Sequence, residues 1–318
     1  MGRQMFHLPT VLILGAGASM PYGFPSGHEL RQRICQGDAY HYLRNYFGSR
    51  AEEFVTAFKN SRLFSIDAFL AKRTEFTDVG KAAIAAILCK LENPRIFDGP
   101  ATPYNTDWDD WYSVLWNKLA SKANTIEDFK SNQLKIITFN YDRSLEYFLI
   151  TSISNTYNVS FYKAQEVLDL IPIVHIYGQL GTLSEVTDRS RRCRAFLDNV
   201  NDADLGIASE GIKVIPEARD DEEVFSKLVE WYKAAHNIAF LGFGFDDLNI
   251  KRLGITQLQN YYVPETSHLH VLATTLGLTK SEEQMKGEAL LGPLKENCWK
   301  PLRENCSGLI RNRAQRFR

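Results

Sequence analysis

The sequence is poor in cysteine, in net charge and in long apolar runs, and each shortage excludes a class of protein. Its five cysteines include no Cys-x-x-Cys pair and stand far apart, at positions 35, 89, 193, 298 and 306. This spacing excludes the usual structural zinc site and is typical of reduced thiols in the cytoplasm. The 37 basic and 38 acidic side chains leave a formal net charge of -1, so charge gives no general attraction to nucleic acid or to an anionic membrane.

Long apolar runs are also missing, because none approaches the roughly 20 residues of a membrane-spanning helix. The N-terminus imitates a signal peptide, since Arg3 precedes a short apolar run and the small residues Ala16-Gly17-Ala18. We reject that interpretation, because the run is only about five residues long and a glycine turn explains the small residues better. The sequence therefore predicts a cytoplasmic protein without a membrane segment. It contains no internal repeat and no flexible linker.

A short apolar run ends abruptly at a glycine turn near the N-terminus. Residues 11–14 read VLIL, and Gly15-Ala16-Gly17-Ala18-Ser19 follows at once. This is the pattern of a buried strand that leads into a phosphate-binding turn. Glycine suits such a turn because it adopts positive φ and lets backbone N–H groups approach a pyrophosphate, and a helix beyond the turn would add its dipole. The alternative is a close-packed connection without a ligand.

Apolar stretches that alternate with helical patterns predict the fold. Residues 28–130 lack strand-like stretches and are predicted to be helical. Further strands are predicted from Leu134, within 171–181, and at 212–215, 238–241 and 269–273. We predict an α/β protein with a Rossmann-like, doubly wound parallel sheet and a helical insertion after the first strand. The predicted units are a Rossmann-like domain (1–27 and 131–278), the helical insertion (28–130), and a helical, basic tail (279–318).

Polar residues follow several of these strands, where an open α/β sheet binds its ligands. Asn140 and Asp142 follow the second strand, and Asp246 follows the fifth. His175 and Tyr177 are two residues apart in the third strand, so they are expected to point to one face. The alternatives are that Asn140 or Asp142 only caps the next helix, and that His175 is a core residue.

A dinucleotide oxidoreductase fits this pattern poorly. Its third glycine would fall at Met20, and no second strand arrives in time to carry the acid that binds ribose about 20 residues on.

Taken together, four motifs in order resemble the sirtuin superfamily. Residues 15–19 with Gly23 and Pro25 resemble its cofactor turn, and residues 138–142 (TFNYD) resemble its T-Q-N-x-D motif. His175 with Gly178 lies where its His-Gly is expected, and residues 242–245 (GFGF) take the place of its Gly-Thr-Ser loop. Tyr177 rather than histidine directly precedes Gly178, so either His175 or Tyr177 fills the catalytic position.

The absence of a zinc module disfavours deacylation. The amino-acid sequences of three stretches favour another branch of the sirtuin superfamily. SIDAFL, TFNYD and GFGFDDLN resemble the sirtuin-like NAD-hydrolases of bacterial antiviral defence. That resemblance implies cleavage of NAD+, as substrate, to nicotinamide and ADP-ribose, with no metal. It also implies a homo-oligomer or a partner such as an ATPase. The alternatives are a catalytically silent NAD or ADP-ribose sensor and an assembly subunit.

The resemblance assigns roles to individual residues. It implies that Asn140 orients water or a ribose hydroxyl, that His175 is the general base and that Asp142 orients its neighbours or balances developing positive charge. The expected binding residues are Gly15, Ala16, Gly17, Ala18, Ser19, Pro25, Thr138, Gly178, Gly242, Phe243, Gly244, Asp246 and Asn249.

Two basic stretches remain. Residues 188–194 (DRSRRCR) are predicted to be an exposed loop. The end of the tail carries four arginines beside Cys306, Leu309 and Ile310, and is interpreted either as a frayed terminus or as a contact surface for assembly.

Overall fold

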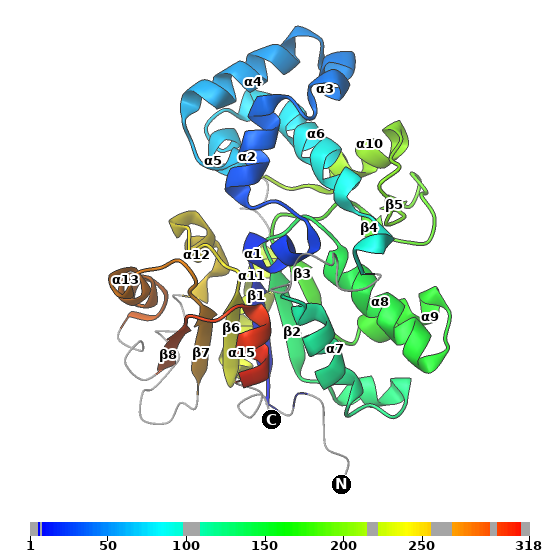
Figure 1. Cartoon of the computed structure of the whole chain (residues 1–318), viewed down its shortest axis with the longest axis vertical. Helices are drawn as coiled ribbons and strands as arrows, with labels where there is room; N and C mark the ends of the chain where they lie inside the picture. The colour runs from blue at the N-terminus through cyan, green and yellow to red at the C-terminus, as the bar shows by residue number, and fades with distance from the viewer. Residues whose placement is uncertain are drawn as a thin grey trace.

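A parallel sheet of six strands forms the centre of the molecule (Figure 1). The computed structural model describes residues 6, 8–97, 109–214, 222–255, 269–292 and 298–312. The strands are β1 (Thr10–Leu14), β2 (Leu134–Thr138), β3 (Ile173–His175), β6 (Asn237–Leu241), β7 (His270–Thr274) and β8 (Trp299–Leu302). They are hydrogen-bonded in the order β3-β2-β1-β6-β7-β8. The chain is therefore a Rossmann-like α/β protein, as the sequence predicts.

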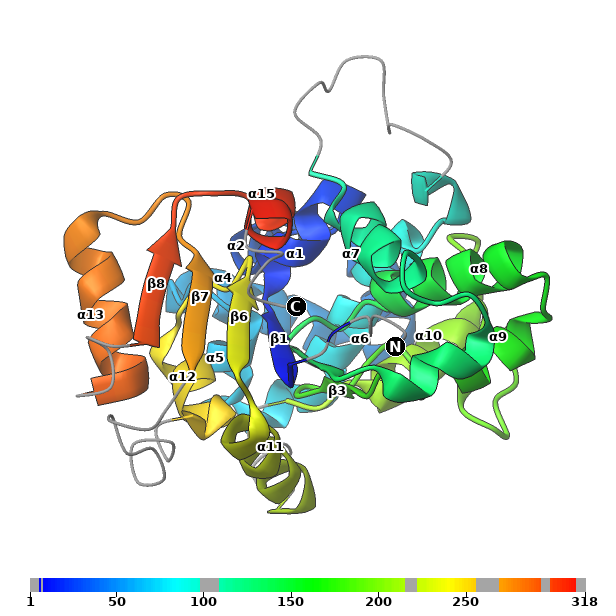
Figure 2. The same ribbon diagram turned by 90° about the horizontal axis from the view of Figure 1, so that it is seen from below.

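The central strands are apolar because helices cover both faces of the sheet. Every residue of β1 and of β6 is buried, and Leu12 lies in register with Ile136 on one side and with Ala239 on the other. Parallel strands buried on both faces favour such continuous apolar runs. Helix α11 (Glu222–Ala234) and helix α15 (Cys306–Asn312) lie on opposite faces of the sheet (Figure 2). The order along the sheet reverses between β1 and β6, which makes this the topological switch point.

Two strand predictions need correction. The strand expected at 212–215 is absent from the described part of that range: Ile212 forms a single antiparallel bridge with Gly178, and Ile215 lies outside the described residues. The edge strand β8, within the tail, is not predicted, because Trp299–Leu302 contains Lys300 and Pro301 and shows no apolar run. Proline is tolerated there because an edge strand leaves part of its backbone unpaired.

A group of helices stands over the carboxyl ends of the strands, as Figure 1 shows. Its members are α2 (Gly27–Gln36), α3 (Tyr40–Phe47), α4 (Ser49–Ser61), α5 (Ile66–Leu70), α6 (Thr77–Leu88) and α10 (Asp202–Gly211). Helix α6 is buried over most of its length, because its alanine-rich sequence lets the neighbouring helices approach from several sides. Ser65 caps α5 as predicted: its side chain accepts a hydrogen bond from the backbone N–H of Ala68.

Five further α-helices of the described residues flank the sheet. They are α7 (Trp111–Ala120), α8 (Ser144–Tyr157), α9 (Phe161–Leu168), α12 (Asp247–Leu253) and α13 (Lys280–Leu291). Strands β4 (Thr182–Leu183) and β5 (Cys193–Arg194) form a separate small sheet. Among the described residues, no helix is both long and apolar enough to cross a membrane.

The tail helix α15 packs inward. Cys306, Leu309 and Ile310 are buried, and the Asp109 carboxylate accepts the backbone N–H groups of Cys306 and Ser307, both at 2.8 Å. These apolar residues therefore belong to the core of this chain, and they are not part of the exposed contact surface that was one of the two interpretations of the tail. The last three arginines lie outside the described residues.

The stretch 188–194 is exposed only in part. Arg189, Arg191 and Arg192 are exposed, but Arg194 is fully buried and forms an ion pair with Glu92. Glu92 also pairs with buried Arg143, whose Nε and Nη2 donate to its two carboxylate oxygens at 3.0 and 2.5 Å. The sequence does not reveal this network, because its members lie far apart in the chain and in segments of different type.

Candidate functional site

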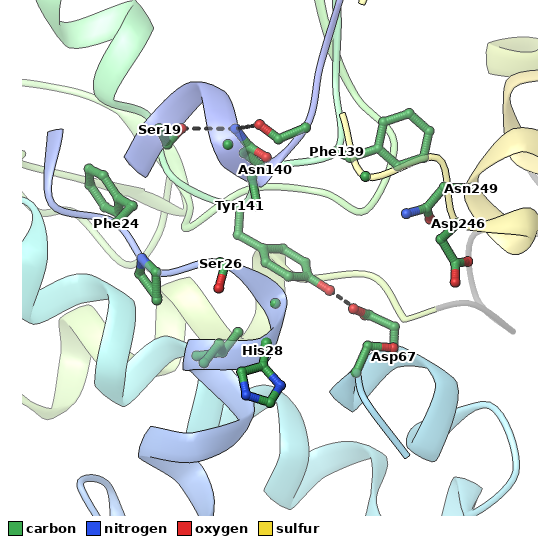
Figure 3. A pocket seen from close by; sticks show the side chains of 18 of the residues that line it. Ser19, Phe24, Ser26, His28, Asp67, Phe139, Asn140, Tyr141, Asp246 and Asn249 are labelled. Atoms are coloured by element: carbon green, nitrogen blue, oxygen red, sulfur yellow. Dashed lines mark hydrogen bonds between the residues drawn. The ribbon is translucent and has the colours of Figure 1, made fainter. Parts of the chain in front are cut away.

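A cavity of about 530 Å³ lies at the switch point, between the carboxyl ends of the strands and the helices above them (Figure 3). Segments after β1, β2 and β6 form one wall, and α2 and the start of α5 form the other. From the sheet side the lining residues are Gly15, Ala16, Gly17, Ser19, Phe139, Asn140, Tyr141, Asp142, Tyr177, Gly242, Phe243, Gly244, Asp246, Leu248 and Asn249. From the helical side they are Phe24, Pro25, Ser26, Gly27, His28, Leu30, Phe64, Ser65, Ile66, Asp67 and Leu88.

The glycine turn packs directly against the loop that follows β6. A Cβ atom on Gly15 would lie 2.6 Å from the carbonyl oxygen of Gly242, and one on Gly242, whose φ is +57°, would lie 2.1 Å from the backbone nitrogen of Ala18. The N–H groups of Gly15 and Gly17 donate to Leu241 and Gly242 at 3.0 and 2.9 Å. These glycines are therefore required for the contact of two loops, and their N–H groups are occupied, contrary to the expectation that they face a pyrophosphate.

The helix expected to add its dipole is also short. Helix α1 (Ala16–Ser19) has four residues, continues into the 3-10 helix Met20–Tyr22, and ends at Gly23, whose φ is 86°. A helix of this length has few aligned peptide dipoles, so its field at the cavity is small.

Asn140 is held at several points with its amide in the cavity. Its Nδ2 donates to the carbonyl oxygen of Gly15 at 3.0 Å and to Ser19 Oγ at 2.8 Å (Figure 3). An amide nitrogen carries two hydrogens, so these bonds use both of them. Its backbone N–H donates to Thr138 Oγ1 at 3.1 Å. Within the described contacts, Oδ1 is the atom of Asn140 left to accept a hydrogen bond from a ligand.

Asp142 lies beside Asn140 and is buried. Its carboxylate accepts hydrogen bonds from the backbone N–H and the hydroxyl of Ser144, and it is hydrogen-bonded to Ser19. Burial raises the pKa of Asp142 to about 6, because the hydrogen bonds that favour the charged form only partly offset desolvation. Asp142 can therefore change its charge near neutral pH.

The structure separates His175 from Tyr177. Strand β3 ends at His175 and the chain turns at 176–177, so the alternation that would place both side chains on one face stops. Tyr177 lines the cavity and its hydroxyl donates to Asn249 Oδ1 at 2.7 Å. His175 lies outside the cavity lining, with Nε2 2.5 Å from Glu146 Oε1 and Nδ1 2.9 Å from the carbonyl oxygen of Asn140. The expectation that either residue reaches the site is wrong for His175.

The other predicted binding residues also divide into those that line the cavity and those that lie outside it. Gly15, Ala16, Gly17, Ser19, Pro25, Gly242, Phe243, Gly244, Asp246 and Asn249 line the cavity. Ala18 is a buried residue of the turn itself, and Thr138 contacts the backbone of Asn140. Gly178, with φ +67°, lines a second cavity of about 340 Å³ together with His175.

Apart from Pro25, sequence reasoning missed the helical wall. Tyr141, next to Asn140, donates from its hydroxyl to Asp67 Oδ1 at 2.5 Å, and this bond links the sheet side of the cavity to α5 (Figure 3). Burial raises the pKa of Asp67. Phe64, at the mouth, is 81% exposed, which is unusual for a side chain of its size. The stretch SIDAFL carries this wall, and its place in the resemblance was the only signal that could have pointed to it.

The charge of the lining is one-sided. Asp67, Asp142 and Asp246 are its acidic members, and the described lining contains neither lysine nor arginine. Anionic groups of a ligand must therefore be bound by hydroxyl, amide and N–H donors, while hydroxyl groups find several carboxylate acceptors.

Comparison with known proteins assigns this chain to no family. No protein-family model matches the chain, and no curated protein matches it.

Proposed function

We propose that this protein binds NAD+ in the switch-point cavity and hydrolyses it to nicotinamide and ADP-ribose. The observation that carries the proposal is the bonding of Asn140, a residue that lines the cavity: both of its amide hydrogens are bound by protein oxygens, so within the described contacts Oδ1 is left to accept a hydrogen bond from a ligand. A fixed acceptor at the carboxyl ends of parallel strands is what a ribose hydroxyl or an attacking water requires. The order of motifs that resembles sirtuin-like NAD-hydrolases supports the same assignment.

The reaction breaks the bond between the nicotinamide nitrogen and ribose C1′. The bonding pair leaves with nicotinamide, which departs neutral, while the oxygen of water bonds to C1′ and one water proton passes to a base. The transition state resembles an oxocarbenium ion, so a nearby carboxylate stabilises it and an acceptor that aligns water or the 2′-hydroxyl accelerates it. No metal is needed for these steps.

The residues of the cavity can fill these roles without an imidazole. Asn140 Oδ1 would orient the water or the hydroxyl, and the Asp142 carboxylate would stabilise positive charge at C1′ and take up the proton. Asp246 and Asn249 would accept hydrogen bonds from ribose hydroxyls. His175 loses the role of general base in this proposal, because its ring contacts Glu146 and the backbone of Asn140.

A silent NAD or ADP-ribose sensor is the second candidate, and the position of His175 favours it. His28 is the one histidine in the described lining, and it lies exposed at the edge. A site whose general base is missing could bind the dinucleotide and leave it intact. Tyr177, which does line the cavity, has a pKa raised by burial, so its phenol stays protonated at neutral pH.

The resemblance extends the proposal to the role of the protein in the cell. Depletion of NAD+ in an infected bacterial cell would make the protein an antiviral effector in the cytoplasm. Control by self-assembly or by a separate regulatory or ATPase partner is part of the same proposal, since an enzyme that destroys NAD+ must be restrained in healthy cells.

The test is incubation of purified protein with NAD+ while nicotinamide release and binding are followed separately. Release above the spontaneous rate, abolished by Asn140→Ala, supports the enzyme. Binding of ADP-ribose by calorimetry without release, with candidate activators present, supports the sensor. Absence of both would refute the assignment of this cavity to NAD+.

A further inference from the structure

His175 has a hydrogen-bond acceptor at each ring nitrogen. Nδ1 lies 2.9 Å from the carbonyl oxygen of Asn140, and Nε2 lies 2.5 Å from Glu146 Oε1. The side chains of His175 and Glu146 are only 8% and 14% exposed, so water competes weakly for either contact. The two contacts join β3, α8 and the segment after β2.

Counting hydrogens shows that this arrangement holds an extra proton. A carbonyl oxygen only accepts, so Nδ1 must carry a hydrogen. The short contact between Nε2 and Oε1 requires a second hydrogen, on the ring or on the carboxyl group. A neutral imidazole ring beside an ionised carboxylate has only one hydrogen for the two contacts. The ring nitrogen without a hydrogen would then point its lone pair at an oxygen that also only accepts.

The same arrangement completes the fixation of Asn140. Its backbone N–H is bound by Thr138, its side-chain nitrogen by Gly15 and Ser19, and its carbonyl oxygen by His175. The contact with His175 is the one that depends on a titratable group of neutral range. When the shared proton is lost, either the bond to Asn140 or the contact with Glu146 must open.

We propose that Glu146 and His175 form a proton-holding clamp that positions Asn140, so that ligand binding in the cavity depends on a proton held outside it. Glu146 thereby becomes a positioning residue, since it lies outside the cavity lining and holds the ring of His175; its charge also contributes to the raised pKa of Asp142. The other charged groups near the ring are Asp142, on the cavity side, and Arg192 and Glu210, which line the second cavity with His175. The proposal rests on the proposed function only for the choice of ligand.

Substitution of Glu146 separates the proton from the contact. In Glu146→Gln the side-chain amide can donate to Nε2 while Nδ1–H still donates to Asn140, so the clamp closes around a neutral ring. Affinity for ADP-ribose should therefore stay near that of the wild type and lose its pH dependence. In Glu146→Ala the clamp opens, and affinity should fall about tenfold to a hundredfold, the usual effect of misplacing a positioned group.

Calorimetry with ADP-ribose between pH 7 and 10 measures the affinity and its pH dependence. This range lies above the Asp142 pKa of about 6, so that titration of Asp142 contributes little. The wild type should bind more weakly as pH rises. Glu166→Gln is the matched control, because Glu166 forms an exposed pair with Lys163 on α9, and it should keep the wild-type profile. A pH dependence that survives unchanged in Glu146→Gln, or wild-type affinity in Glu146→Ala, would overturn the proposal.

A second measurement needs no ligand. Nuclear magnetic resonance of ¹⁵N-labelled histidine and ¹³C-labelled glutamate should show the extra proton at pH 7 in the wild type, on the His175 ring or on the Glu146 carboxyl group, and a neutral His175 ring in Glu146→Gln. If ADP-ribose fails to bind at any pH, the proposed function fails, and the clamp is still decided by this titration: a ring that is neutral at pH 7 in the wild type, with Glu146 ionised, refutes it.

Discussion

Replacement of Asn140 by alanine tests the candidate site most directly, since the structure sets separate expectations for stability and for activity. The variant loses two hydrogen bonds, to Gly15 and to Ser19 Oγ. At about 0.5–1.5 kcal/mol for each, the free energy of unfolding should fall by about 1–3 kcal/mol. The low end is expected because both oxygens border the cavity and can bind water instead. A domain of ordinary stability stays folded after such a loss.

The loss of activity should be larger than the loss of stability. Removal of one group that positions water or a hydroxyl in the transition state lowers the rate by about two to four orders of magnitude. Nicotinamide release is the assay, and urea unfolding followed by circular dichroism verifies the fold. Near wild-type release from a folded Asn140→Ala protein would refute the role of Asn140.

Replacement by aspartate is the finer test of the same residue. Asn140→Asp keeps an acceptor oxygen but puts a second oxygen against the carbonyl of Gly15, and it adds negative charge to a lining that contains Asp67, Asp142 and Asp246. Repulsion should turn the side chain away, so this variant should be no more active than Asn140→Ala. Wild-type activity would show that the bonds made by Nδ2 do not matter.

Further predictions concern stability, pH and metal. Glu92→Gln removes the shared partner of buried Arg143 and Arg194, and it should lower the free energy of unfolding by about 3–5 kcal/mol in a urea titration; a loss under about 1 kcal/mol would contradict the network. Asp142→Asn should stabilise the protein, because the pKa of Asp142 is raised from 3.8 to about 6. Because the fold favours neutral Asp142, the contribution of this residue to the free energy of unfolding is present below pH 4 and is lost as pH rises through 6. The stability gained by Asp142→Asn should therefore be absent at pH 4 and reach up to about 3 kcal/mol at pH 8. An equal gain in stability at both pH values would refute this. Leu309→Ala should cost about 2–5 kcal/mol by the same titration, since Leu309 is fully buried, whereas a free tail would show no change. EDTA should leave nicotinamide release unchanged, and inactivation that added metal restores would contradict the proposed chemistry.

The sheet could be predicted from sequence because its signal is local. Runs such as residues 11–14 and 238–241 are apolar throughout, and only strands buried on both faces tolerate that. The strand expected at 212–215 shows the limit of the same rule. Ile212 is buried, but its bridge is to Gly178, so burial alone did not imply a place in the central sheet.

The candidate site was predictable where chain order places residues at strand ends, as for Asn140 and Asp246. It was not predictable for residues whose side-chain orientation depends on the position at which a strand ends. His175 and Tyr177 are two residues apart in either case, and the end of β3 at His175 decides which of them faces the cavity. The wall formed by Asp67 was hidden for a second reason, because its link to Tyr141 joins segments separated by 74 residues.

The contacts around Asp109 have a consequence for the order in which the protein is completed during synthesis. Asp109 holds the start of α15, and Trp111, just beyond it, donates from its indole nitrogen to the carbonyl oxygen of Ala18 at 2.7 Å. The glycine turn thus rests on α7, which in turn receives α15, a helix that follows Asp109 by 197 residues in the chain. A nascent chain that has already formed β1 and β2 still lacks this support. The glycine turn beside the cavity therefore gains this support only after α15 has been synthesised.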